Sequence, residues 1–390
     1  MVSRILLHVG PSVANYGVQS SAVVPNIGFA SPEFNRAMKY SLEQFRLVTG
    51  ADETYMPFII PGGGTAAMES VVSFLAKDSN ILIVTNGVFG DRWEGILSRY
   101  PVKFKVLRAK AGKAVTTSQI VSELSGGNFD AVTITQVETS TGVRMPMKEI
   151  AEAVRPYVKL IIVDGVASIG GERMNASQWD IDVCLTASQK AIGAQTGAGL
   201  LVASRSAMEM LRQPSISGYL LDLRNWNKIM ENFLSGGGGY FATPPIGTIF
   251  SLAESFNRIE EETMDARISR HRTCSEAFRK GVMEMGLDIV ALENLRSNTV
   301  TGVYIENVDI QKFIRTAMDR GVEFGAGVHP EIKDRYFRVG HMGWVEPSHI
   351  IKALNVIEQS LNALGHNIEK DSGTLAAKAV FDRYPEKVQQ

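Results

Sequence analysis

Cysteine is almost missing from this chain of 390 residues, which holds only Cys184 and Cys274. Neither belongs to a Cys-x-x-Cys pair, so the sequence argues against a disulfide framework and against a structural zinc site. Disulfides form in oxidising compartments, and a chain this poor in cysteine favours a reducing one. We therefore expect a cytoplasmic protein without a bound metal.

An excess of charge of one sign is also missing. Lysine and arginine number 40, aspartate and glutamate number 41, and the net charge is −1. Nucleic acids and membrane surfaces attract dense positive charge, so neither partner is expected. No apolar run approaches the roughly 20 residues that cross a bilayer. The apolar run at residues 5–7 is too short for a signal peptide.

What is present is an ordinary globular composition, with 45% hydrophobic and 21% charged residues. Between residues 55 and 204, short apolar runs alternate with amphipathic stretches. Strands separated by helices form a mainly parallel sheet covered on both faces, and ligands bind at the carboxyl ends of such strands. The predicted strands are 55–60, 81–85, 102–107, 131–137, 160–163, 183–187 and 199–203.

The pattern changes after residue 205. Four glycines at 236–239 predict a loop, and one long helix is predicted from about 246 to 285. Alternation returns in the last third of the chain, with a predicted helix at 310–319 between strands. This order predicts an α/β fold with an N-terminal segment (1–20), a large domain (21–260) and a smaller C-terminal α+β domain (261–390).

A glycine turn follows the first predicted strand of the large sheet. Residues 62–67 have the sequence GGGTAA and open a helix, so their backbone N–H groups suit an anion. The turn also fits a dinucleotide-binding pattern, which requires an acid at the end of the next strand. That strand ends in Thr85, Asn86 and Gly87, so the nicotinamide interpretation lacks its ribose ligand. A tight turn without a ligand remains an alternative.

Two charged residues end other strands of this sheet. Asp164 follows a buried run and is able to bind a metal, orient a base or pair with a cationic ring nitrogen, unless it only caps a helix. Lys190 follows another strand and precedes a run of small residues and glycines. In isolation such a lysine is most often solvated. The free space beside its amine, however, suits a lysine that forms a Schiff base.

Together these parts resemble the fold type I enzymes that use pyridoxal phosphate. The aspartate precedes the lysine by 26 positions, and a glycine turn lies upstream of both. Four short sequence motifs are similar to those of class V aminotransferases, above all the alanine–glyoxylate and serine–pyruvate aminotransferases. These motifs are residues 86–90 (NGVFG), 138–143 (ETSTGV), 163–171 (VDGVASIGG) and 187–191 (ASQKA). The resemblance covers about residues 5 to 365.

The resemblance implies a role for each residue that holds the cofactor. Lys190 would form the Schiff base and move the proton, and Asp164 would keep the pyridinium nitrogen protonated. Thr139 would bind the phenolic oxygen and Phe89 would stack on the ring. The phosphate would lie against Gly63, Gly64, Thr65 and Gln189, although relatives often have histidine where Thr65 stands.

Further residues are implied for the partner subunit and the substrate. Tyr240 and Thr243 resemble a segment that reaches into the other subunit of a homodimer and binds its phosphate, so the active sites would be shared. Arg338 matches the arginine that grips the α-carboxylate. Gly10 and Phe29 lie in segments that narrow the substrate pocket in relatives. Residues 325–328 are a candidate for a mobile lip over the site.

We therefore expect a transamination between a small amino acid, such as alanine or serine, and glyoxylate or pyruvate. One alternative is another class V reaction, of the lyase or desulfurase type. A desulfurase needs a mobile cysteine, whereas Cys184 falls in a predicted strand and Cys274 in a predicted helix. A second alternative is a protein that binds pyridoxal phosphate without turnover.

Overall fold

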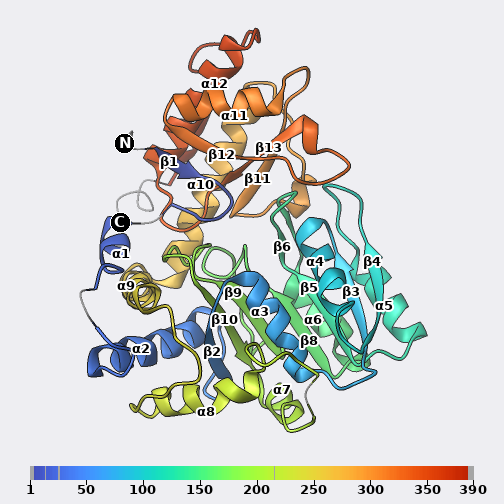
Figure 1. Ribbon diagram of the computed structural model, residues 1–390. Helices are drawn as coiled ribbons and strands as arrows, with labels where there is room; N and C mark the ends of the chain where they lie inside the picture. Colours follow the sequence, from blue (N-terminus) through green and yellow to red (C-terminus); the bar gives the residue numbers. More distant parts are fainter. Residues whose placement is uncertain (1–3, 14, 25–26, 215, 385–390) are drawn as a thin grey trace.

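The computed structural model describes residues 4–13, 15–24, 27–214 and 216–384. Its larger sheet occupies the lower half of Figure 1. The strand order is β2-β10-β9-β8-β5-β3-β4, and β10 alone runs antiparallel to its neighbours. The strands are β2 (Met56–Pro61), β3 (Asn80–Thr85), β4 (Lys103–Arg108), β5 (Ala131–Thr135), β8 (Leu160–Asp164), β9 (Val183–Ala187) and β10 (Ala198–Ala203). The expected, mainly parallel sheet is confirmed.

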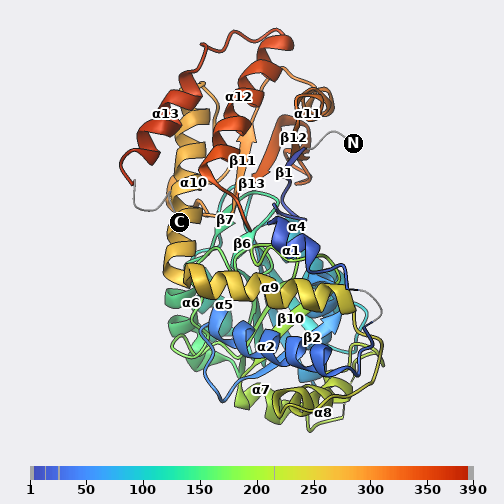
Figure 2. The same cartoon turned by 90° about the vertical axis from the view of Figure 1, so that its left-hand side faces the viewer.

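Helices pack on this sheet through apolar stripes. In α2 (Pro32–Val48), the side chains of Phe34, Met38, Leu42 and Phe45 recur at four- and three-residue spacing and are buried. Figure 2 shows α2 beside α9 (Ile246–Glu262) on one side of the molecule. The other helices of this part are α1 (Tyr16–Ser20), α3 (Gly64–Ser70), η1 (Val71–Phe74), α4 (Val88–Leu97), α5 (Thr117–Gly126), α6 (Met147–Val154), η2 (Arg155–Tyr157), α7 (Arg205–Met210) and α8 (Leu223–Leu234).

A second sheet lies above the first in Figure 1, with the order β1-β12-β13-β11. Its first strand, β1 (Ile5–Leu7), comes from the start of the chain and runs parallel to β12 (Val322–Ala326). The remaining strands are β11 (Val300–Tyr304) and β13 (Tyr336–Gly340), and a small hairpin joins β6 (Val137–Glu138) to β7 (Val143–Arg144). The helices are α10 (Met264–Glu284), η3 (Glu293–Leu295), α11 (Ile310–Asp319), η4 (Lys333–Arg335), α12 (Pro347–Ala363) and α13 (Ser372–Phe381).

The single long helix expected from 246 to 285 was wrong, because α9 and α10 are separate helices. Thr263 interrupts them with a φ of 67°. Its hydroxyl accepts a hydrogen bond from the backbone N–H of Ala266 and so caps α10. Neither glycine nor proline marks this position, which explains why the sequence pattern missed the break.

Two hydrophobic cores accompany the two sheets. The first contains buried residues from Val18 to Ile259, and the second combines Leu7 with residues from Cys274 to Phe381. This division supports, as a proposal, the predicted boundary near residue 260. Residues 1–3 and 385–390 of the predicted outer segments lie outside the described residues. Across the described ranges, no helix has both the length and the apolar character that a membrane crossing requires.

Candidate functional site

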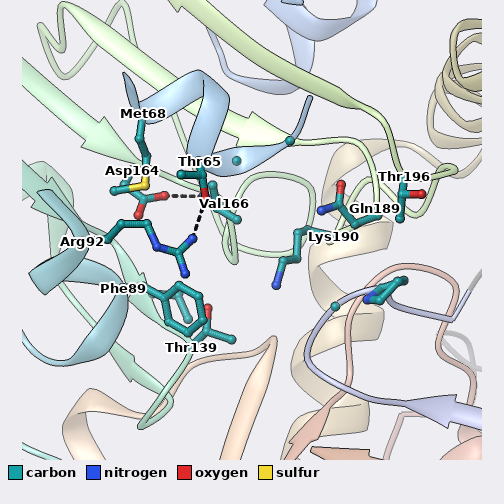
Figure 3. Close-up of a pocket in the computed structure, with 15 residues that line it drawn as sticks. Thr65, Met68, Phe89, Arg92, Thr139, Asp164, Val166, Gln189, Lys190 and Thr196 are labelled. Atoms are coloured by element: carbon teal, nitrogen blue, oxygen red, sulfur yellow. Dashed lines mark hydrogen bonds between the residues drawn. The ribbon is translucent and has the colours of Figure 1, made fainter. Parts of the chain in front are cut away.

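One cavity lies at the carboxyl ends of the large sheet, where the predicted site residues gather (Figure 3). Its volume is about 340 Å³, in the range of small-molecule sites. Of the predicted site residues, nine line it: Gly10, Gly63, Gly64, Thr65, Phe89, Thr139, Asp164, Gln189 and Lys190. The strands that end here are parallel, which is why side chains far apart in the sequence meet at this edge.

Lys190 lies three residues beyond the end of β9 and extends into the cavity. Its amine donates a hydrogen bond to the carbonyl oxygen of Val9. Gly10 follows with a φ of 131°, and a Cβ on it would lie 2.2 Å from Lys190 Nζ. Burial, and after it the positive charge of Arg338, lowers the pKa of Lys190 to about 8. The neutral form that a nucleophile needs is therefore far more populated near neutral pH than in an ordinary lysine.

Asp164 is the last residue of β8 and is buried. Its carboxylate accepts hydrogen bonds from the backbone N–H of Val166 at 2.9 Å and from the hydroxyl of Thr135 at 3.3 Å. Burial raises its pKa to about 6. Within the described ranges, no lysine or arginine forms an ion pair with it. The site thus presents a buried carboxylate that has room for a cationic partner.

Phe89 reaches the cavity from the first turn of α4, and a buried carboxylate holds that turn. Glu138 accepts hydrogen bonds from the backbone N–H groups of Phe89 and Gly90, at 3.0 to 3.2 Å, and from Ser140. A negative charge at a helix N-terminus is stabilised by the helix dipole. The next residue, Thr139, lines the cavity, so the same short segment positions two of the predicted cofactor residues.

Arg92 also lines this cavity, although it was not among the predicted site residues. Its guanidinium donates a hydrogen bond to the Thr65 hydroxyl at 2.7 Å and lies 4.8 Å from the centre of the Phe89 ring (Figure 3). The sequence contained a signal for Arg92, because residues three apart, such as Phe89 and Arg92, share one face of a helix. Because α4 begins at Val88, Phe89 and Arg92 lie on this one helix.

Arg338 is buried on β13 and does not line the cavity itself. Its Nε donates to the carbonyl of Ala326 at 2.8 Å, and an Nη donates to the carbonyl of Thr139 at 3.3 Å. It lies near enough to Lys190 for its charge to lower the pKa of that amine. Arg338 is therefore held beside the cavity by two backbone carbonyls.

The other predicted residues lie apart from the cavity in the same chain. The ring of Phe29 stacks on that of Tyr240, with 4.8 Å between centroids, and the Tyr240 hydroxyl is 3.4 Å from the Thr243 hydroxyl. Tyr240 is 56% exposed although it is a large aromatic residue. The structure thus brings Phe29 together with the segment that was predicted to serve a second subunit.

Comparison with known proteins agrees with this architecture. The family model for class V aminotransferases matches residues 12–342. The chain is 35% identical to alanine–glyoxylate aminotransferase 1 of Saccharomyces cerevisiae, over 87% of this chain and 91% of that protein. It is 28% identical to serine–glyoxylate aminotransferase of Hyphomicrobium methylovorum, over 96% and 93%. A crystal structure of alanine–glyoxylate aminotransferase from Nostoc sp. superposes with a TM-score of 0.87, at 27% identity over 93% and 96%.

The chemistry of the cavity fits pyridoxal phosphate, whose reactive parts are an aldehyde, a ring nitrogen and a phosphate. Lys190 offers an amine with a lowered pKa, and Asp164 offers a buried carboxylate for the ring nitrogen. The start of α3 at Gly64 carries no side-chain cap, which leaves backbone N–H groups for the phosphate. The chain belongs to the class V aminotransferases, and its cofactor is pyridoxal phosphate.

Proposed function

We propose that this enzyme transfers the amino group of a small amino acid, such as alanine or serine, to glyoxylate or pyruvate, and that Lys190 binds the cofactor as a Schiff base. The observation that carries the proposal is the lowered pKa of Lys190 in a cavity that also contains the buried Asp164. The names of the yeast, Hyphomicrobium and Nostoc relatives support this choice of substrates.

The bound cofactor supplies an electron sink for the electron pair that remains when the substrate α-carbon loses its proton. The chain's own residues do the rest. Lys190 would take that proton and deliver it to the C4′ carbon of the cofactor, because its lowered pKa, about 8, makes the neutral amine accessible near physiological pH. Asp164 would stabilise positive charge on the ring nitrogen, and Phe89 would pack against the ring. Gly63, Gly64, Thr65 and Gln189 would hold the phosphate, and Thr139 would bind the phenolic oxygen.

Substrate size follows from the walls of the cavity. Gly10 and Pro11 bring backbone close to Lys190, which favours a short side chain. Arg338 binds the α-carboxylate that all amino acids share. Cys184 and Cys274 are both buried, and burial raises the pKa of each thiol, so neither is a reactive thiolate of the kind that desulfurase chemistry needs.

The active unit in this proposal is a homodimer with shared sites. Tyr240 and Thr243 lie outside the cavity of their own chain and are accessible, as a contribution to a partner's phosphate site requires. Tyr16, Val23 and Tyr219 are also more than three-quarters exposed, which a second copy of this chain would cover. The two buried, unpaired cysteines support a cytoplasmic location.

The test is a panel of amino donors with glyoxylate, pyruvate and 2-oxoglutarate as acceptors. Alanine with glyoxylate, and serine with glyoxylate or pyruvate, should exceed aspartate with 2-oxoglutarate and glutamate with glyoxylate by at least about tenfold in kcat/KM, or ~1.4 kcal/mol. Lys190→Ala should abolish turnover and change the near-visible absorbance of the bound cofactor. A preference for glutamate would overturn the substrate assignment, and a Lys190→Ala variant with normal turnover would overturn the role of Lys190.

A further inference from the structure

The cavity's neighbourhood contains a buried tyrosine that the proposed reaction does not use. Tyr336 lies on β13 two residues before Arg338, so both side chains point to the same face of the strand. The residue is completely buried, and burial raises the pKa of its phenol. The hydroxyl therefore keeps its proton and is able to donate as well as accept a hydrogen bond.

The hydroxyl of Tyr336 makes three hydrogen bonds, all to backbone. It accepts from the N–H groups of Val328 and His329, each at 3.0 Å, and it donates to the carbonyl of Ser140 at 2.6 Å. Its ring also lies against Gly327, where an added Cβ would come within 2.7 Å of Cε1. One side chain thus joins residues 326–330 to the segment 138–140.

Arg338 spans the same two segments. Its Nε bonds the carbonyl of Ala326, and its Nη1 bonds the carbonyl of Thr139. The two carbonyls that orient the guanidinium therefore lie next to the groups that Tyr336 holds together. If the segments separated, Arg338 would lose one of its two carbonyl partners, and its direction would no longer be defined.

We propose that Tyr336 is a positioning residue for Arg338. It holds residues 326–330 against the segment 138–140, so that the guanidinium keeps one orientation and leaves its remaining N–H groups free for a carboxylate. This inference rests on the proposed role of Arg338 as the site of the α-carboxylate. It also implies that residues 325–328, the segment predicted as a mobile lip, are held by Tyr336.

Tyr336→Phe tests the inference, because it keeps the ring and removes only the hydroxyl. The holoenzyme should show a rise of about three- to tenfold in KM for both the amino donor and the 2-oxo acid, as expected for one lost hydrogen-bonding group that acts through Arg338. The cofactor absorbance should be unchanged. The matched control is Tyr304→Phe, because Tyr304 is the register partner of Tyr336 and its hydroxyl has no hydrogen bond among the described residues. It should leave both KM values unchanged.

A purely structural role would lower the melting temperature of Tyr336→Phe without moving either KM, and that result would overturn the inference. Gly327→Ala disturbs the same contact without changing Tyr336. Its Cβ would lie 2.3 Å from the carbonyl oxygen of Lys333 and close to the Tyr336 ring. It should raise both KM values in the same way. It keeps the inference testable should Tyr336→Phe fail to fold, and normal KM values in Gly327→Ala would then refute it.

The double variant with Arg338→Ala separates this inference from the proposed function. If Tyr336 acts through Arg338, adding Tyr336→Phe to Arg338→Ala should change KM by less than about twofold. Additive effects in the double variant would refute the positioning role while leaving Arg338 as the carboxylate site. An Arg338→Ala variant with normal KM for both substrates would instead refute the proposed role of Arg338.

Discussion

Gly10→Ala is the most direct test of how closely the N-terminal segment confines the catalytic amine. An added Cβ would lie 2.2 Å from Lys190 Nζ, 2.5 Å from Cε and 2.8 Å from Cδ. Ordinary contact begins at about 3.4 Å, so the flexible end of the Lys190 side chain, which carries the amine, must shift by roughly 1.2 Å. A displacement of about 1 Å at a reacting atom costs on the order of a hundredfold in rate. We expect kcat to fall by about that factor, or ~2.7 kcal/mol.

The backbone at Gly10 adds a second cost, since its φ of 131° lies where side chains are strained. Gly286→Ala separates the two effects. Gly286 has a φ of 78°, but nothing lies within 4 Å of its added Cβ. This control should lose stability to denaturant, by about 1–2 kcal/mol, and keep its turnover. The reasoning is refuted if Gly10→Ala stays within about threefold of the wild-type kcat, or if Gly286→Ala loses as much activity.

Three further predictions concern charge, assembly and pH. Asp164→Asn removes the carboxylate beside the ring nitrogen, so kcat of the cofactor-saturated enzyme should fall about a hundredfold or more; a loss below about threefold places Asp164 outside the reaction. Tyr240→Phe should speed loss of cofactor on dialysis, and a stable, cofactor-saturated monomer in sedimentation would refute the shared site. Burial lowers the pKa of His341 to about 3. As pH falls below about 6.5, the unfolded state binds a proton at this histidine while the folded state does not, so the folded protein loses stability. In His341→Gln, the unfolding free energy should therefore depend less steeply on pH between 5 and 6.5, by up to ~1.4 kcal/mol per pH unit, and an unchanged slope contradicts this.

The parts of the fold that were predicted correctly are those with a local signal. The helix at 310–319 begins and ends as expected, because the side chains of Ile310, Phe313 and Ala317 recur at helical spacing and are buried. The buried strand β8 likewise forms one apolar run that ends at Asp164. The break at Thr263 was missed because no glycine or proline marks it, although the structure shows a φ of 67° there and ion pairs from Glu262 to Arg267 and Arg270 on α10.

The site residues also separate into those with a local sequence signal and those without one. Lys190, Asp164 and the glycine turn follow strands, and their places at one sheet edge follow from a parallel topology. Arg92 and Glu138 were not foreseen as site residues. Their importance comes from contacts across the fold, to Thr65 at a separation of 27 residues and to Phe89 at 49. Tyr336 belongs to this group too, since its carbonyl acceptor on Ser140 lies 196 residues away.

The pairing of β1 with β12 has a consequence for the order in which the enzyme is made. Ile5 meets Val322, so the first strand waits for more than three hundred further residues to be translated. At ~5–20 residues per second, that delay is on the order of 15 to 60 s. For the last 119 of these residues, from 203 to 322, the large sheet is complete in sequence while β1 still lacks its partner strand. An unpaired strand in a nascent chain is prone to pair wrongly, so this segment is where a chaperone has the most to protect. The sheet that anchors the N-terminal segment beside the cavity is therefore completed only after most of the chain has been translated.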